Sequence, residues 1–212
     1  MKPFLTIAVL LAAAAGAAGQ TVASSPSAVQ PLLIGAAAPD ADLRDMAGTP
    51  VKLKAALGGK PGVVIFYRGG WCPYCNAHLH EIKDVAKDLQ ALGYVTVAIS
   101  PDRPEELAKT AAKHSLPYAL LSDSKFDAAR AFGIAFQLDP DTVTKYARFG
   151  VDLRKLSGEP HDWLPVPSMF LIGKDGKVKF AYTNPDYRVR LKAKVLLAEA
   201  RAALDDPDAP KP

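Results

Sequence analysis

Two cysteines stand two residues apart in the motif Cys72-Pro73-Tyr74-Cys75, and the 212-residue chain has no others. Only a thiolate reacts, and the free N–H groups at a helix N-terminus stabilise that anion, so a cysteine placed there has a lowered pKa. The spacing therefore predicts a redox-active pair that alternates between dithiol and disulfide. We expect Cys72 at the exposed tip of the turn and Cys75 one turn further into a helix.

The segments on either side of this motif support that interpretation. Residues 63–67 form a continuous apolar run, which is typical of a buried parallel strand. From residue 77 to 92 apolar residues recur at spacings of three and four, and Gly93 then ends the predicted amphipathic helix. A structural disulfide would close only a four-residue loop here and would constrain little of the unfolded chain. The combination of strand, C-x-x-C and helix therefore favours catalysis.

Five neighbouring residues are candidates for supporting roles. Pro73 restricts the loop, and Trp71 is placed to shield one side of it. The glycines at 69 and 70 leave the approach free of side chains. Arg68 is either a group that stabilises a thiolate or a departing oxyanion, or a surface cation at the end of a strand. The sequence leaves both readings of Arg68 open.

The remaining patterns predict an α/β fold, with a central mixed sheet flanked by helices on both faces. Further strands are expected at 94–99, 118–121, 168–172 and 178–182, with helices at 102–114, 126–132 and 189–204. Asp175-Gly176 between two apolar runs indicates a hairpin, so the last strands should be antiparallel. In residues 134–165 the apolar residues show no regular helical or strand spacing. This segment is interpreted as an insertion, with a helix near 142–149, that either covers the site or forms a dimer contact.

The N-terminus has the layout of a secretory signal peptide. Lys2 precedes an uncharged apolar run at 4–18 and then small residues. The run is shorter than the roughly 20 residues that a membrane span needs. We expect a signal peptide at 1–19, a flexible lead-in at 20–33, one domain at 34–204 and a disordered tail at 205–212. Export to the periplasm or the cell exterior would place the cysteines where disulfides persist.

Composition excludes some classes of protein. The chain has 26 Lys and Arg against 22 Asp and Glu, a net charge of +4 without a basic cluster, so nucleic acid is not an expected partner. Two cysteines supply only half of a four-cysteine zinc site. Any metal site would therefore need histidines or acidic residues.

Three segments together resemble a known family. They are FYRGGWCPYC at 66–75, APD at 38–40 and VPSMFLI at 166–172. The chain from about 34 to 204 resembles the thioredoxin-fold, peroxiredoxin-like proteins of the AhpC/TSA family. The resemblance implies a thioredoxin-like fold and a thiol-dependent oxidoreductase that needs no organic cofactor, acts on peroxides and is recycled by a thiol reductant protein. It also implies that Val166–Pro167 is a cis peptide facing the cysteines.

The motif departs from the family pattern at two positions. The family has a proline, a threonine four residues on and a peroxidatic cysteine three residues later, and these positions fall on Arg68, Cys72 and Cys75. Two mechanisms stay open. In a peroxidase Cys75 would attack the peroxide and condense with Cys72. In a protein disulfide oxidoreductase Cys72 would attack a disulfide and Cys75 would resolve it. Peroxide reduction is the leading expectation.

A non-enzymatic alternative uses the same cysteines. Exported thioredoxin-fold copper carriers combine two cysteines with a distant histidine, and Cys72, Cys75 and His161 are the candidates for such a soft site. A carrier of this kind would bind Cu(I) with loss of both free thiols and would require His161. A redox enzyme would turn over without metal.

Other charged residues near the predicted site are expected to face solvent. His78 and His80 fall on the polar side of the helix that follows Cys75. Arg188 or Arg190 could supply the family's second active-site arginine, but a solvated start of the last helix is the favoured interpretation.

Overall fold

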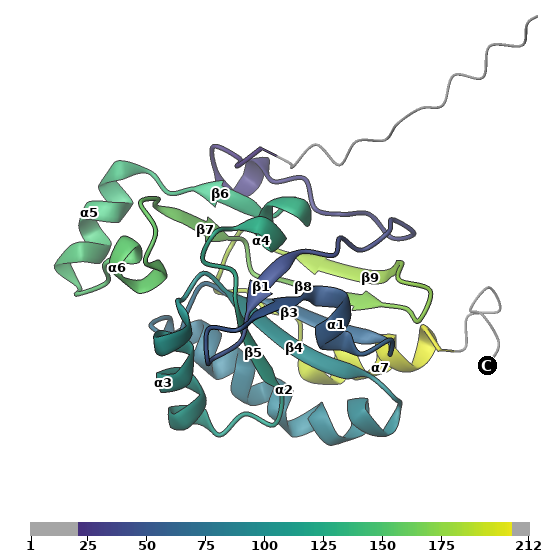
Figure 1. Cartoon of the computed structure of the whole chain (residues 1–212). Helices are drawn as coiled ribbons and strands as arrows, with labels where there is room; N and C mark the ends of the chain where they lie inside the picture. The colour runs from purple at the N-terminus through teal and green to yellow at the C-terminus, as the bar shows by residue number, and fades with distance from the viewer. Residues whose placement is uncertain (1–20, 205–212) are drawn as a thin grey trace, which may run out of the picture.

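The computed structural model describes residues 21–204, so the predicted signal peptide at 1–19 and the predicted tail at 205–212 lie outside the described residues. A seven-stranded sheet forms the centre of this part of the chain, in the order β2-β1-β5-β4-β3-β8-β9 (Figure 1). Its strands are β1 (Asp42–Arg44), β2 (Pro50–Lys52), β3 (Gly62–Phe66), β4 (Val95–Ser100), β5 (Ala119–Ser122), β8 (Ser168–Ile172) and β9 (Val178–Thr183).

The sheet is mixed, as the sequence predicts. Strand β3 is buried along its whole length, runs parallel to β4 and pairs antiparallel with β8. Strands β4 and β5 are also parallel, whereas β8 and β9 form an antiparallel hairpin around Asp175 and Gly176. Gly176 adopts a φ of 75°, a left-handed conformation that suits glycine in a tight turn.

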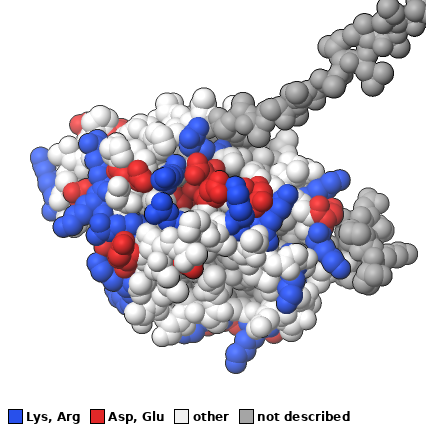
Figure 2. All heavy atoms as spheres, viewed as in Figure 1, with Lys and Arg blue, Asp and Glu red and all other residues white. Residues whose placement is uncertain are grey.

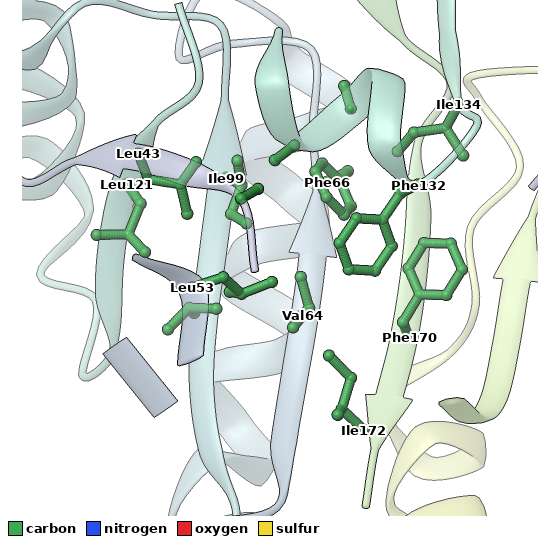
Figure 3. Close-up of a cluster of buried hydrophobic side chains, with 14 of the residues drawn as sticks. Leu43, Leu53, Val64, Phe66, Ile99, Leu121, Phe132, Ile134, Phe170 and Ile172 are labelled. Atoms are coloured by element: carbon green, nitrogen blue, oxygen red, sulfur yellow. The ribbon is translucent and has the colours of Figure 1, made fainter. Parts of the chain in front are cut away.

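Helices cover both faces of the sheet. One face packs against α2 (Pro73–Ala91), α3 (Pro104–His114) and α7 (Ala193–Ala202). The other packs against α1 (Leu53–Leu57) and α4 (Asp127–Ala131), around the apolar cluster drawn in Figure 3. In that cluster the ring of Phe66 lies 5.0 Å from Phe132 and 6.1 Å from Phe170 between centroids. Strand β3 is buried between the two apolar clusters, and the C-x-x-C motif follows its end.

The insertion forms a compact unit beside the sheet (Figure 1). It consists of β6 (Ala135–Gln137), α5 (Pro140–Arg148), α6 (Leu153–Ser157) and β7 (Trp163–Pro165), with β6 and β7 paired antiparallel. The predicted helix near 142–149 corresponds to α5. In the segment predicted as a lead-in at 20–33, Ala23 exchanges backbone hydrogen bonds with Ala135 and Gln137 at 2.9 and 2.8 Å. This segment also contains a short 3₁₀ helix, η1 (Pro26–Ala28).

The surface of the described part mixes both signs of charge. Figure 2 shows lysine and arginine side chains interleaved with acidic ones on the visible face. Within residues 21–204, no helix is both long enough and apolar enough to cross a membrane.

Candidate active site

The two cysteines lie where β3 passes into α2. Cys72 is the N-cap residue of α2 with extended backbone, and Pro73 occupies the first turn, where its missing N–H costs no hydrogen bond. The carbonyl of Cys72 accepts hydrogen bonds from the amides of Cys75 and Asn76, both at 3.1 Å. Cys72 therefore sits at the end of the helix where unpaired N–H groups favour an anion.

Both sulfurs are buried, which corrects the expectation of an exposed Cys72. Its exposed fraction is 1%, and that of Cys75 is 0%. Two neighbours account for the difference. The Arg68 side chain reaches the Cys72 sulfur from one side, and Trp71 packs against both the cluster under α2 and the small core of the insertion. The insertion therefore covers the site, which was one of the two roles expected for it.

The glycines before the motif allow close packing rather than an open approach. A Cβ atom at Gly70 would lie 1.9 Å from Oγ1 of Thr110 on α3, and one at Gly69 would lie 2.4 Å from Nε1 of Trp71. The carboxylate of Asp102 accepts a hydrogen bond from the Gly70 amide at 2.7 Å. The Asn76 side chain donates to the Gly70 carbonyl at 2.8 Å. These contacts fix the loop that carries Cys72.

One arginine approaches each sulfur. Nη1 of Arg68 lies 3.9 Å from Sγ of Cys72, and the Arg68 side chain is buried, so Arg68 is not a surface cation. Nη2 of Arg190 lies 3.4 Å from Sγ of Cys75. The expectation of a solvated helix start was wrong for Arg190, because α7 begins only at residue 193 and the preceding segment crosses the site. Arg188 does face solvent, where it pairs with Asp186.

Helix α2 holds the segment that carries Arg190. The His78 ring is hydrogen-bonded through Nε2 to the Leu191 carbonyl at 2.9 Å, and the Glu81 carboxylate accepts from the Ala193 amide at 3.0 Å. His78 is therefore buried, contrary to the expected solvated position, whereas His80 is exposed as expected. Burial lowers the pKa of His78, so the ring is neutral near pH 7.

The environments of the two thiols separate their pKa values. A hydrogen bond from Cys75, followed by the positive charge of Arg68, lowers the pKa of Cys72 from 9.0 to about 6, against an opposing effect of burial. Burial, reinforced by the neighbouring Cys72 sulfur, raises the pKa of Cys75 well above its ordinary value. At neutral pH the site therefore holds a Cys72 thiolate beside a protonated Cys75.

Aromatic rings enclose the Arg68 guanidinium. Its central carbon lies 4.1 Å from the ring centroid of Tyr187, 5.0 Å from that of Trp71 and 5.5 Å from that of Tyr146. Nη2 of Arg68 also donates a hydrogen bond to the Tyr146 hydroxyl. These residues come from different parts of the chain, so only the folded protein assembles the enclosure.

A cavity of about 270 Å³ opens beside Arg68 and is also lined by Tyr146, Pro167 and Tyr187. Pro167 thus lies near the site, but the predicted cis peptide at Val166–Pro167 was wrong: no described residue follows a cis bond. Pro165 ends β7 and Ser168 begins β8, so the chain runs directly from one strand into the next. The trans form that X-Pro bonds prefer accommodates this path.

His161 takes no part in the site. Its ring stacks on Trp163 with centroids 4.7 Å apart, and Nε2 is bonded to the Ser124 carbonyl at 2.8 Å. Among residues 21–204, no three histidine, cysteine or acidic side chains gather as a metal site requires. The copper-carrier alternative was therefore wrong in combining His161 with Cys72 and Cys75.

A thioredoxin-like sheet with a buried C-x-x-C pair at a helix N-terminus, one sulfur a thiolate and the other protonated, defines a thiol oxidoreductase. The AhpC/TSA family matches residues 34–181, and the chain belongs to that family. The chain is 30% identical over 173 residues to peroxiredoxin Bcp of Bacillus subtilis strain 168, covering 82% of this chain and 95% of that protein. It is 28% identical over 156 residues to peroxiredoxin Bcp of Escherichia coli K12, covering 74% of this chain and 88% of that protein.

A solved structure agrees with these relatives. The crystal structure of peroxidoxin BcpB from Mycobacterium tuberculosis superimposes with a TM-score of 0.61 at 26% identity, covering 80% of this chain and 96% of that one. The predicted thioredoxin-like fold and enzyme class are thereby confirmed.

Sequence reasoning missed three residues of the site. Tyr146 lies 78 positions from Arg68, and Tyr187 precedes the last helix. Asp102 was read only as part of a helix start. The predicted helix near 142–149 placed Tyr146 on an amphipathic element, but no local pattern indicates which surface that element covers.

Proposed function

We propose that this protein reduces peroxides through a Cys72/Cys75 dithiol–disulfide cycle in which Cys72 is the attacking thiol. The observation that carries the proposal is the position of Cys72 at the N-terminus of α2, with Nη1 of Arg68 3.9 Å from its sulfur. The lowered pKa of Cys72 and the raised pKa of the buried Cys75 agree with this geometry. Membership of the AhpC/TSA family and the relatives named peroxiredoxin support peroxide as the substrate.

The cycle needs only these two side chains and a reductant. The Cys72 thiolate attacks one peroxide oxygen, so an S–O bond forms as the O–O bond breaks, and the departing oxygen takes a proton from solvent water. Sulfur loses two electrons and the peroxide gains them. The Cys75 thiol then attacks the sulfenic acid, which releases water and forms the disulfide. A thiol reductant protein returns the pair to the dithiol by exchange.

The charges around the sulfurs favour this order over attack by Cys75. A buried thiol with a raised pKa is a poor nucleophile at neutral pH, whereas a thiolate at a helix N-terminus is reactive. Arg190, at 3.4 Å from the Cys75 sulfur, is placed to stabilise that sulfur when Cys75 gives up its proton in the second step.

Rapid mixing of the reduced protein with one equivalent of hydrogen peroxide tests the proposal. We expect fast loss of both thiols in the wild type, a sulfenic acid that persists in Cys75→Ser, and no fast reaction in Cys72→Ser. Fast oxidation that survives in Cys72→Ser but is lost in Cys75→Ser would reverse the assigned order. Oxidation of the wild type no faster than that of free cysteine would refute peroxide reduction.

Protein disulfide exchange is the second candidate, because the lowered pKa of the first cysteine in a C-x-x-C pair suits attack on a disulfide as well. Rapid reduction of a disulfide substrate, dependent on Cys72 and combined with a slow peroxide reaction, would favour it.

We further propose export to the periplasm or cell exterior. The proposal rests on the sequence of residues 1–20 alone. Fractionation of cells, with sequencing of the mature N-terminus, tests it: retention of Met1 in the cytoplasmic fraction would contradict export.

A further inference from the structure

Helix α5 brings one hydroxyl group to the active-site arginine. The helix begins after Asp139, whose side chain caps it by accepting a hydrogen bond from the Thr142 amide at 2.8 Å. None of its residues is fully buried. Its contact with the site is made by Tyr146, whose ring meets Trp71 edge-on with centroids 5.4 Å apart. The Tyr146 ring is thus fixed by packing on a residue adjacent to Cys72.

The Arg68 guanidinium connects this hydroxyl to the reactive sulfur. Nη1 is directed at Sγ of Cys72, at 3.9 Å, while Nη2 of the same planar group donates to the Tyr146 hydroxyl. Arg68 and Tyr146 both line the cavity of about 270 Å³, together with Val166 and Pro167. A small molecule at this end of the cavity would meet the guanidinium and the phenol together. The Cys72 sulfur does not line the cavity itself and lies behind Arg68, 3.9 Å from Nη1.

The phenol has a proton to donate. A tyrosine hydroxyl can accept one hydrogen bond and donate another, and here it accepts from Arg68. Among residues 21–204, the Tyr146 hydroxyl donates to no protein acceptor. A hydroxyl held by a cation is also a better donor, because the cation stabilises charge that develops on its oxygen.

We propose that Tyr146 is a catalytic residue that donates a hydrogen bond to the departing oxygen of the peroxide, an inference that rests on the proposed function. When the Cys72 thiolate attacks, negative charge develops on the oxygen that leaves as the O–O bond breaks. Donors aimed at developing charge lower the barrier most when they are already in place. Arg68 supplies the positive charge, Tyr146 supplies the directed donor, and the departing oxygen ends as an alcohol or water after taking a proton from solvent water.

The test removes only the hydroxyl. In Tyr146→Phe the ring still packs on Trp71, so the rate constant with hydrogen peroxide should fall by about 100- to 1,000-fold, the range for loss of one donor to a developing oxyanion. The rate constant for reaction of Cys72 with the aromatic disulfide DTNB should change less than about twofold, because the aromatic thiolate that leaves from DTNB needs no such donor. Tyr94→Phe is the matched control. It also loses one hydroxyl hydrogen bond, to the Ala200 carbonyl at 3.0 Å, but at the opposite end of α2.

A second substrate makes the test independent of small structural changes. Peracetic acid expels acetate, a weak base that needs little help, so the Tyr146→Phe defect should shrink to less than about threefold. A defect of equal size with hydrogen peroxide, peracetic acid and DTNB would overturn the inference and leave Tyr146 a structural residue.

The proposed function can survive failure of this inference. A wild-type protein that reacts fast with hydrogen peroxide, together with an equally fast Tyr146→Phe, would overturn the role of Tyr146 alone. A slow wild-type protein would overturn the proposed function and this inference with it.

Discussion

The hydrogen bond between the two thiols is the largest cause of the lowered pKa of Cys72, and it can be removed with a single substitution. Cys75→Ala deletes the donor, whereas Cys75→Ser replaces it with a hydroxyl of similar size. A hydrogen bond to a charged group contributes about 1.5 to 3 kcal/mol. One pKa unit corresponds to about 1.4 kcal/mol, so Cys75→Ala should raise the pKa of Cys72 by about 1 to 2 units.

This rise in pKa should strongly reduce the fraction of Cys72 that is thiolate at neutral pH. With a pKa of about 6, Cys72 is about nine-tenths thiolate at pH 7, and its reactivity rises with pH through 6 and then levels off. In Cys75→Ala the thiolate fraction at pH 7 should fall to between about a half and a tenth. In Cys75→Ser it should stay close to the wild-type value.

Two measurements read this directly. Thiolate absorbance near 240 nm, followed against pH in both variants, reports Cys72 alone because no other cysteine remains. The pH dependence of iodoacetamide alkylation gives the same pKa by reactivity and extends the comparison to the wild type. Equal pKa values near 6 in both variants would show that Arg68 and the helix N-terminus suffice. A pKa near 9 in Cys75→Ser would refute the electrostatic account of the site.

Three further predictions concern the scaffold. Gly70→Ala should destabilise the protein by about 1 to 3 kcal/mol in urea unfolding, because the new methyl group overlaps Thr110. Adding Thr110→Gly to this variant removes the overlapping side chain and should restore part of the lost stability. Burial raises the pKa of Asp123 to about 7, so the contribution of Asp123 to stability is full below pH 4 and is lost as pH rises to 7. In Asp123→Asn the free energy of unfolding should therefore differ less between pH 4.5 and pH 6.5 than in the wild type. His78→Leu leaves the Leu191 carbonyl without its side-chain partner, which should cost about 1 to 3 kcal/mol and, by loosening Arg190, slow disulfide formation after Cys72 is oxidised.

The chemistry of the protein could be read from adjacent residues. The apolar run of β3, the C-x-x-C motif and the amphipathic pattern of α2 are contiguous, and each has a local physical cause in side-chain period, capping and proline geometry. The Asp175-Gly176 hairpin is predictable for the same reason, because its turn needs a positive φ at glycine. These signals were enough to predict a mixed sheet and a redox pair.

The surroundings of the pair depended on contacts between distant segments. Arg190 contacts the Cys75 sulfur 115 positions away because His78 and Glu81 of α2 hold the chain before α7. Tyr146 reaches Arg68 only because the insertion folds back over the end of β3.

The sequence by itself determined that Cys72 and Cys75 form a thiol pair at the start of a helix, since helix period, proline and cysteine spacing act over a few residues. Only the tertiary structure decided that Cys72 is buried, that an arginine lies beside each sulfur and that Tyr146 lines the cavity. Burial and charge proximity depend on which surfaces pack together, and no short stretch of sequence encodes that choice.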